Sequence, residues 1–167
     1  ADLAVVNGTG INASDDNDRK DVLAALVLPY PNGSFTVAAY EGRTGRGTAA
    51  QDKDRLLAGL DIGDGETRLR GEYVRGRDLG QDVMGWYARL SRQVTPTATL
   101  YVKYDEFDED RGRRGDLLQR WSAGWVEELD ARTRLTLAWE TRSVGDAFSE
   151  HDDYVGDAAV LQLQAKF

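Results

Sequence analysis

The feature that most constrains the fold is a two-residue alternation of apolar and polar side chains in residues 158–167, which read AAVLQLQAKF. From Ala159 on, every second residue is apolar, and the residues between them are mostly polar. Because successive side chains of a strand point to opposite faces, this period predicts a strand with one apolar and one polar face. A chain that ends in such a strand, on Phe167, indicates a bacterial outer-membrane β-barrel that its last strand closes.

The same alternation recurs along the chain and predicts about ten strands, with no helix-period segment of useful length. Connections after the even-numbered strands are short, and those after the odd-numbered strands are mostly long, as in membrane barrels. We therefore expect an all-β, antiparallel up-and-down transmembrane β-barrel in one domain, 1–167, which is either complete or the carboxy-terminal part of a larger barrel. The expected strands are 1–8, 22–30, 34–42, 55–62, 67–75, 83–93, 97–105, 117–127, 133–142 and 158–167.

Composition excludes several classes of function. The chain has 29 acidic and 21 basic residues, whereas a nucleic-acid partner requires a basic footprint, so we expect none. It has no cysteine, which excludes disulfides and thiolate metal sites, and we expect no cofactor. No apolar run approaches the ~20 residues of a membrane helix. Low hydropathy remains compatible with a membrane barrel, because only alternate residues of its strands face lipid.

One face of the predicted strands is apolar, and several of its aromatic residues lie near strand ends, where membrane barrels carry aromatic girdles. A soluble lipocalin-like barrel would show the same period with the two faces exchanged, and ordinary core aromatics are the alternative to girdles. If the apolar face contacts lipid, the lipid-facing residues include Trp86, Trp121, Trp139, Leu161, Leu163 and Phe167.

The opposite face of strands four to ten carries nine cations against the four acids Asp61, Glu72, Asp105 and Glu140, although the whole chain is acidic. Cationic side chains that line a pore attract anions and replace part of their hydration. The alternative is a solvated face of mixed charge. The predicted pore-lining residues are Arg68, Arg70, Arg89, Lys103, Arg120 and Arg134.

Five segments resemble, in order, the phosphate-selective porin family of the O/P type. They are NGTGINASDDNDRKDVLAAL, FTVAAYEGR, RLRGEYVRGRD, GWYARLSRQVTPTATLYVKYDEFDED and LQLQAKF. The resemblance implies an outer-membrane barrel, commonly trimeric, that passes anions such as phosphate through a basic constriction. The matches cover nearly the whole chain but only the carboxy-terminal half of a typical member. The phosphate-binding lysines and arginines of the family are not carried over to positions here.

The first expected strand, 1–8, offers at most eight residues, whereas a membrane strand needs ~9–11. Either this strand is a short closing partner for the last one, or the chain belongs to a larger barrel. A closed barrel of about ten strands has a lumen that side chains largely fill. An open pore would need further strands or several copies.

Three further motifs are weak. The single histidine, His151, lies beside acids but has no placed nucleophile, so we expect no enzyme activity. The Gly-rich segment 42–47 lacks the Lys-Ser/Thr and the helix of a phosphate loop. An acidic loop could bind Ca²⁺ through hard oxygen ligands, but its spacing matches no defined calcium loop, so we expect no metal. Its acids are Asp105, Asp108, Glu109 and Asp110.

The sequence is compatible with three functions. The first is a porin-like barrel with a basic lumen in the bacterial outer membrane, which admits small anions by passive diffusion. Its partners are the lipid bilayer, small anions and either a homo-oligomer such as a trimer or a larger envelope assembly. The second is a small closed barrel that serves as a structural or interaction subunit of an envelope complex. The third is a soluble β-barrel binder.

Overall fold

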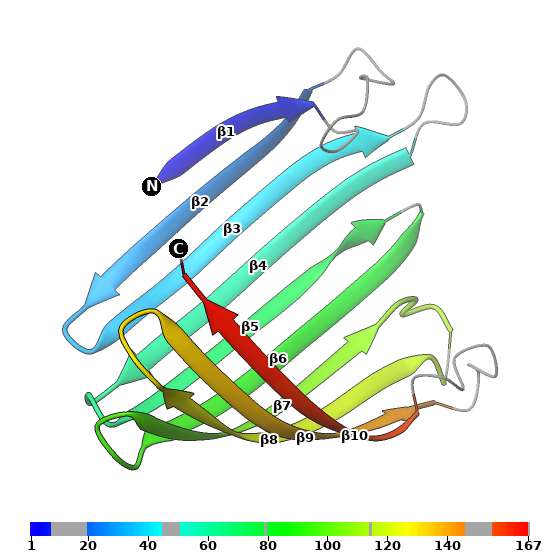
Figure 1. Ribbon diagram of the computed structural model, residues 1–167. Helices are drawn as coiled ribbons and strands as arrows, with labels where there is room; N and C mark the ends of the chain where they lie inside the picture. The colour runs from blue at the N-terminus through cyan, green and yellow to red at the C-terminus, as the bar shows by residue number, and fades with distance from the viewer. Residues whose placement is uncertain (8–19, 45–50, 79, 114, 146–154, 167) are drawn as a thin grey trace.

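The computed structural model describes residues 1–7, 20–44, 51–78, 80–113, 115–145 and 155–166, and every regular element in them is a β-strand. Each strand pairs antiparallel with its neighbours in sequence, so that one ten-stranded sheet has the order β1 to β10 (Figure 1). The strands are β1 (Asp2–Asn7), β2 (Lys20–Tyr30), β3 (Gly33–Thr44), β4 (Gln51–Gly63), β5 (Thr67–Asp78), β6 (Gln81–Gln93), β7 (Ala98–Asp108), β8 (Leu117–Glu128), β9 (Thr133–Val144) and β10 (Gly156–Ala165).

The strand register keeps the two kinds of side chain on separate faces of the sheet. Partners in an antiparallel pair share a face, so the parity of one strand fixes that of the next. Tyr73 pairs with Trp86 on one face, and Arg70 pairs with Arg89 on the other, three residues along the same two strands. The two faces that the sequence alternation predicts for strands four to ten are therefore continuous across β4 to β10.

The sheet has no apolar core. Within the described ranges, Ala98 is the one buried hydrophobic residue. Large apolar side chains are instead exposed, with exposed fractions of 71% for Leu161 and 57% for Trp121. A continuous exposed apolar surface of this kind marks a face that contacts a partner or a membrane rather than water. No helix in the described part of the chain is long and apolar enough to cross a membrane.

The connections define two rims. At the hairpin rim, the connections 31–32, 64–66, 94–97 and 129–132 are short, as predicted. At the opposite rim, here called the loop rim, the predicted long connection between β5 and β6 is wrong. Both strands extend further than expected, to Asp78 and from Gln81, because the alternation continues and Arg77 Nε lies 3.3 Å from Asp82 Oδ1 across the pair. β7 likewise continues to Asp108 and takes in part of the expected acidic loop.

The sheet curls strongly, and β10 lies in front of the middle strands in the view of Figure 1. It does not close into a ring: among the described residues, β1 pairs with β2 alone and β10 with β9 alone. The expected closure by the last strand is therefore not formed. β1 has six residues against the ten of β10, so it matches only part of that edge.

Candidate functional site

All six basic residues predicted to line a pore lie on one face of the sheet. Arg70, Arg89 and Lys103 are paired in register across β5, β6 and β7, and Arg120 faces Asp105 across β7 and β8. The opposite face carries the residues predicted to contact lipid. Those that the structure describes there are Trp86, Trp121, Trp139, Leu161 and Leu163, while Phe167 lies outside the described residues.

The basic face is the inner face of the curl. Its side chains converge from neighbouring strands and are partly covered, although they are long and charged: the exposed fraction is 25% for Lys103, 22% for Asp105 and 16% for Glu140. On the other face, large apolar side chains such as Trp139 stand exposed. Curvature thus brings the charged side chains together and spreads the apolar ones apart.

At one end of the inner face, Asp61 on β4 holds two arginines of β5. Arg68 approaches it with two nitrogens, Nε at 2.5 Å from Oδ1 and Nη2 at 2.8 Å from Oδ2. Arg70 Nε lies 2.9 Å from the same Oδ2. Two cations therefore share one carboxylate, which leaves an excess positive charge at this end.

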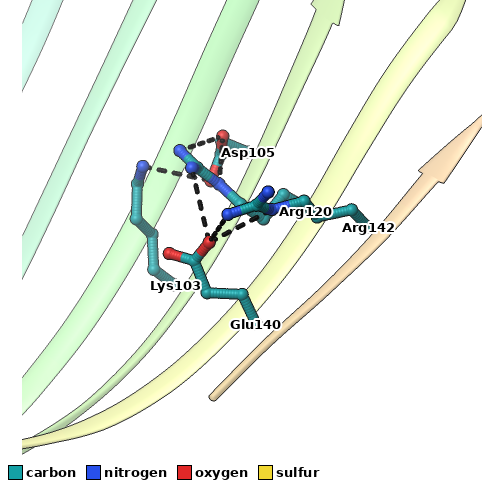
Figure 2. A network of polar contacts seen from close by, with 5 residues as sticks. All are labelled: Lys103, Asp105, Arg120, Glu140 and Arg142. Atoms are coloured by element: carbon teal, nitrogen blue, oxygen red, sulfur yellow. Dashed lines mark hydrogen bonds and ion pairs between the residues drawn. The ribbon is translucent and has the colours of Figure 1, made fainter. Parts of the chain in front are cut away.

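A second network joins β7, β8 and β9, and Figure 2 shows its five side chains pointing toward one another. Asp105 accepts Lys103 Nζ at 3.0 Å and Arg120 Nη2 at 2.9 Å. Glu140 accepts Arg142 Nη2 at 2.6 Å and lies 3.8 Å from Arg120 Nη1. Three cations are balanced by two carboxylates, so this network also carries a net positive charge.

Arg89 lies between these two groups and has a different environment. Its guanidinium carbon is 4.0 Å from the centre of the Tyr101 ring, a cation–π contact. No described carboxylate lies within ion-pair distance of it. Tyr101 itself lies against Gly124 on β8, where a Cβ would come within 2.5 Å of the ring. Gly124 thus makes room for the ring that supports Arg89.

Sequence reasoning missed three features of this face. Glu128 lies 2.6 Å from Arg134 Nη2, but it falls one residue beyond the predicted end of its strand. The prediction of the inner face counted charged residues only, so it left out Tyr87 and Tyr101. Tyr87 donates a hydrogen bond to Glu72 at 3.0 Å. Extending the strand parity by one residue and including tyrosine would have found them.

The outer face has an aromatic cluster toward the loop rim. Tyr104 lies between Trp86 and Trp121, with ring centres 5.1 and 4.7 Å apart. Glu106 accepts hydrogen bonds from Tyr104 at 2.8 Å and from Trp86 Nε1 at 3.3 Å, and Gln119 donates to Tyr104 at 2.9 Å. The cluster is apolar on one side and polar on the other, as amphipathic rings at a water interface are.

Comparison with known proteins gives a fold and nothing closer. No protein-family model matches the sequence, and no curated protein matches it. Among solved structures, the chain is similar to the anion-selective porin from Comamonas acidovorans, with a TM-score of 0.63 and 18% sequence identity. The match covers 98% of this chain and 50% of that porin.

The fold is that of a porin barrel wall. This chain spans half the length of the porin that it resembles. The all-β, antiparallel up-and-down architecture expected from the sequence is confirmed, and the likeness supports a porin-like fold. The match does not separate phosphate-selective porins from other porins.

The structure gives no support for a site at the remaining sequence motifs in the part of the chain that it describes. His151 lies outside the described residues, as does most of segment 42–47, of which 42–44 end β3. In the part of the chain that the structure describes, no group of three or more acidic, histidine or cysteine side chains is placed to hold a metal ion. Asp105, one of the calcium candidates, is occupied by Lys103 and Arg120.

Proposed function

We propose that this chain forms a wall of an anion-admitting pore in the bacterial outer membrane, non-enzymatic and open to passive diffusion of small anions such as phosphate. The observation that carries the proposal is the row of three cations, Arg70, Arg89 and Lys103, on adjacent strands of the face opposite the apolar one. Neighbouring strands are ~4.8 Å apart, so an anion that passes one of these cations is already near the next.

A membrane location is supported by the exposed outer face and by strand length. β2 to β10 have 10 to 13 residues, and a tilted membrane strand needs ~9–11. The resemblance to the O/P porin family supports phosphate as a substrate, the carboxy-terminal half of the barrel as the part present, and a trimer as the assembly.

In this proposal the inner cations attract anions and replace part of their hydration shell. Five of the six predicted pore residues are paired with carboxylates, which lowers their attraction for a passing ion. Arg89 is held by a ring instead of a carboxylate. We therefore assign Arg89 the largest share of the selectivity, with Arg68, Arg70, Lys103, Arg120 and Arg134 supplying the surrounding field.

Conductance of the refolded protein in planar bilayers tests the proposal. The wild type should pass current and prefer anions, as measured by the reversal potential in a salt gradient. Arg89→Gln should reduce the anion-to-cation permeability ratio several-fold. Arg75→Gln is the matched control, because Arg75 also lies on β5–β6 but on the outer face, paired with Met84. Absence of current would exclude the pore, and an equal effect of the two variants would exclude the assignment of selectivity to Arg89.

The second candidate is a closed barrel that serves as a structural or interaction subunit of an envelope complex. Its support is the same ion pairing, since side chains that bridge β7, β8 and β9 fill space on the inner face (Figure 2). This candidate predicts a folded, membrane-inserted protein with no ion-selective current.

A further inference from the structure

The loop rim contains an acidic pair, buried Asp116 and half-buried Asp108, that the pore does not use. β7 ends at Asp108 and β8 begins at Leu117, and Asp116 lies directly before β8. Asp116 is 3% exposed. A buried charge is costly unless it is paired, hydrogen-bonded or bound to a metal.

One carboxylate oxygen of each residue has no visible partner. Asp108 Oδ1 and Asp116 Oδ2 are both buried and accept no hydrogen bond from the described part of the chain. Asp108 pairs with Leu117 across β7 and β8, so the Asp116 backbone is one residue away from the position opposite Asp108, and the charge of Asp116 acts on the Asp108 carboxylate. Two neighbouring, like-charged groups, each with a buried and unused oxygen, are an arrangement that a bound cation would stabilise.

The neighbouring charges do not neutralise the pair. The Asp110 carboxylate accepts the Gly112 backbone N–H at 2.9 Å, and the Asp110 backbone N–H bonds to Asp108. Arg111 contributes a favourable charge to Asp108, but no ion pair joins the two in the described structure. One oxygen on each carboxylate therefore stays available.

The backbone around the pair is fixed on both sides. The Arg111 N–H donates to the Asp82 carbonyl of β6 at 2.9 Å, and the Gly145 N–H donates to the Leu117 carbonyl of β8 at 3.0 Å. Gly115 adopts a left-handed conformation, φ +88°, directly before Asp116. Hydrogen bonds thus hold the backbone on both sides of the pair.

We propose that Asp108 and Asp116 bind a divalent cation, Ca²⁺, at the loop rim where β7 meets β8. Ca²⁺ takes six to eight oxygen ligands, so backbone carbonyls and water would supply those that the two carboxylates do not. With two carboxylates only, the affinity should be on the order of 10⁻⁴–10⁻³ M, the range of weak extracellular sites. The site does not depend on pore activity.

Terbium luminescence with Ca²⁺ competition tests the site on the refolded full chain in detergent. Tb³⁺ should bind the wild type and be displaced by millimolar Ca²⁺. Asp116→Asn and Asp108→Asn should each weaken binding by at least tenfold, because each removes a charged ligand of similar shape. Asp130→Asn is the control, since this carboxylate lies at the opposite rim and accepts the Arg132 backbone N–H at 2.7 Å.

The outcomes separate binding from folding. The mobility of unheated samples in gel electrophoresis reports whether each variant is folded, and Asp108→Asn serves if Asp116→Asn does not fold. No Ca²⁺-displaceable signal in the wild type overturns the site. So does unchanged binding in a folded Asp116→Asn or Asp108→Asn variant. Proton uptake by the wild type near neutral pH without Ca²⁺ binding would assign a shared proton to the pair instead.

Discussion

At the scale of single residues, the inner face combines charges of two kinds. Arg68, Arg120 and Arg134 are held by carboxylates, which offset part of each positive charge. Arg89 is held by the face of Tyr101, which orients the guanidinium without cancelling its charge. In the proposed pore, the group that holds each cation, rather than the number of cations, decides which residue an anion would meet as a full positive charge.

The contact between Tyr101 and Arg89 can be tested by changing an uncharged residue, Gly124. In Gly124→Ala the new Cβ would lie 2.5 Å from the Tyr101 ring, so the ring must move and Arg89 with it. We expect reduced anion selectivity in planar bilayers and a stability loss of about 1–3 kcal/mol from overpacking. Gly59→Ala is the control, because its nearest neighbour would be 3.6 Å away, an ordinary contact. Equal selectivity of both variants and the wild type would contradict the role of Tyr101.

Two turn residues at the hairpin rim predict acid sensitivity. Hydrogen bonds from the Thr67 and Arg132 backbone N–H groups lower the pKa values of the Asp64 and Asp130 carboxyls below their usual value. A lowered folded-state pKa stabilises the fold above the unfolded-state pKa, and that stabilisation is lost as pH falls through the folded value. Asp130→Asn should therefore be less stable than the wild type at pH 7 and equally stable near pH 2, as measured by urea unfolding. A difference that does not change with pH would contradict this.

At the scale of strands, the alternation predicted most of the sheet. It failed where contacts between strands determine the strand ends or the position of a side chain. The existence and order of all ten strands followed from the two-residue period. The short connection between β5 and β6 was not predicted, because Gly76 has the character of a turn residue. The ion pair between Arg77 and Asp82, which extends both strands, becomes visible only in the structure. The support of Arg89 by Tyr101 and Gly124 involves three strands, and no local pattern encodes it.

The inner face also changes along the sheet, which the charge count did not reveal. On β2 the inner positions are Leu23, Ala25 and Val27, which continue in register to Tyr40, Ala38 and Thr36 on β3. Among the described residues, the arginines and lysines of the inner face therefore lie on β4 and later strands, whereas β1 and β2 place the acids Asp2 and Asp21 on it.

A charge placed on each face of β9 tests which face meets lipid. Leu137 lies on the outer face beside Trp125 and Leu161, and its neighbour Thr136 lies on the inner face. Leu137→Lys should destabilise the membrane-inserted fold by about 2–4 kcal/mol, the cost of a cation near the middle of a bilayer. Thr136→Lys should cost much less. Urea-dependent folding into lipid vesicles measures both, and equal losses would exclude lipid contact on the outer face.

At the scale of the whole molecule, the two sheet edges impose the strongest condition. In the described structure, β1 and β10 each leave one row of backbone groups unpaired. An unpaired backbone group in hydrocarbon costs several kcal/mol, so open edges do not persist in a bilayer. In a membrane, both edges must therefore be paired, either with each other or with strands from elsewhere.

Hydrogen exchange in vesicles tests this condition directly. Amides of β10 that point away from β9 should be protected as strongly as those of the central strand β5, and exchange within minutes would contradict a membrane barrel. A double variant, Val5→Cys with Leu161→Cys, tests whether β1 is the strand that pairs with β10. The natural chain has no cysteine, so these two would be its only thiols. A disulfide within one molecule would show closure and a lumen largely filled by side chains, which favours the structural subunit. Protection without that disulfide is the result expected if further strands pair both edges and widen the lumen, in which Arg89 would meet passing anions.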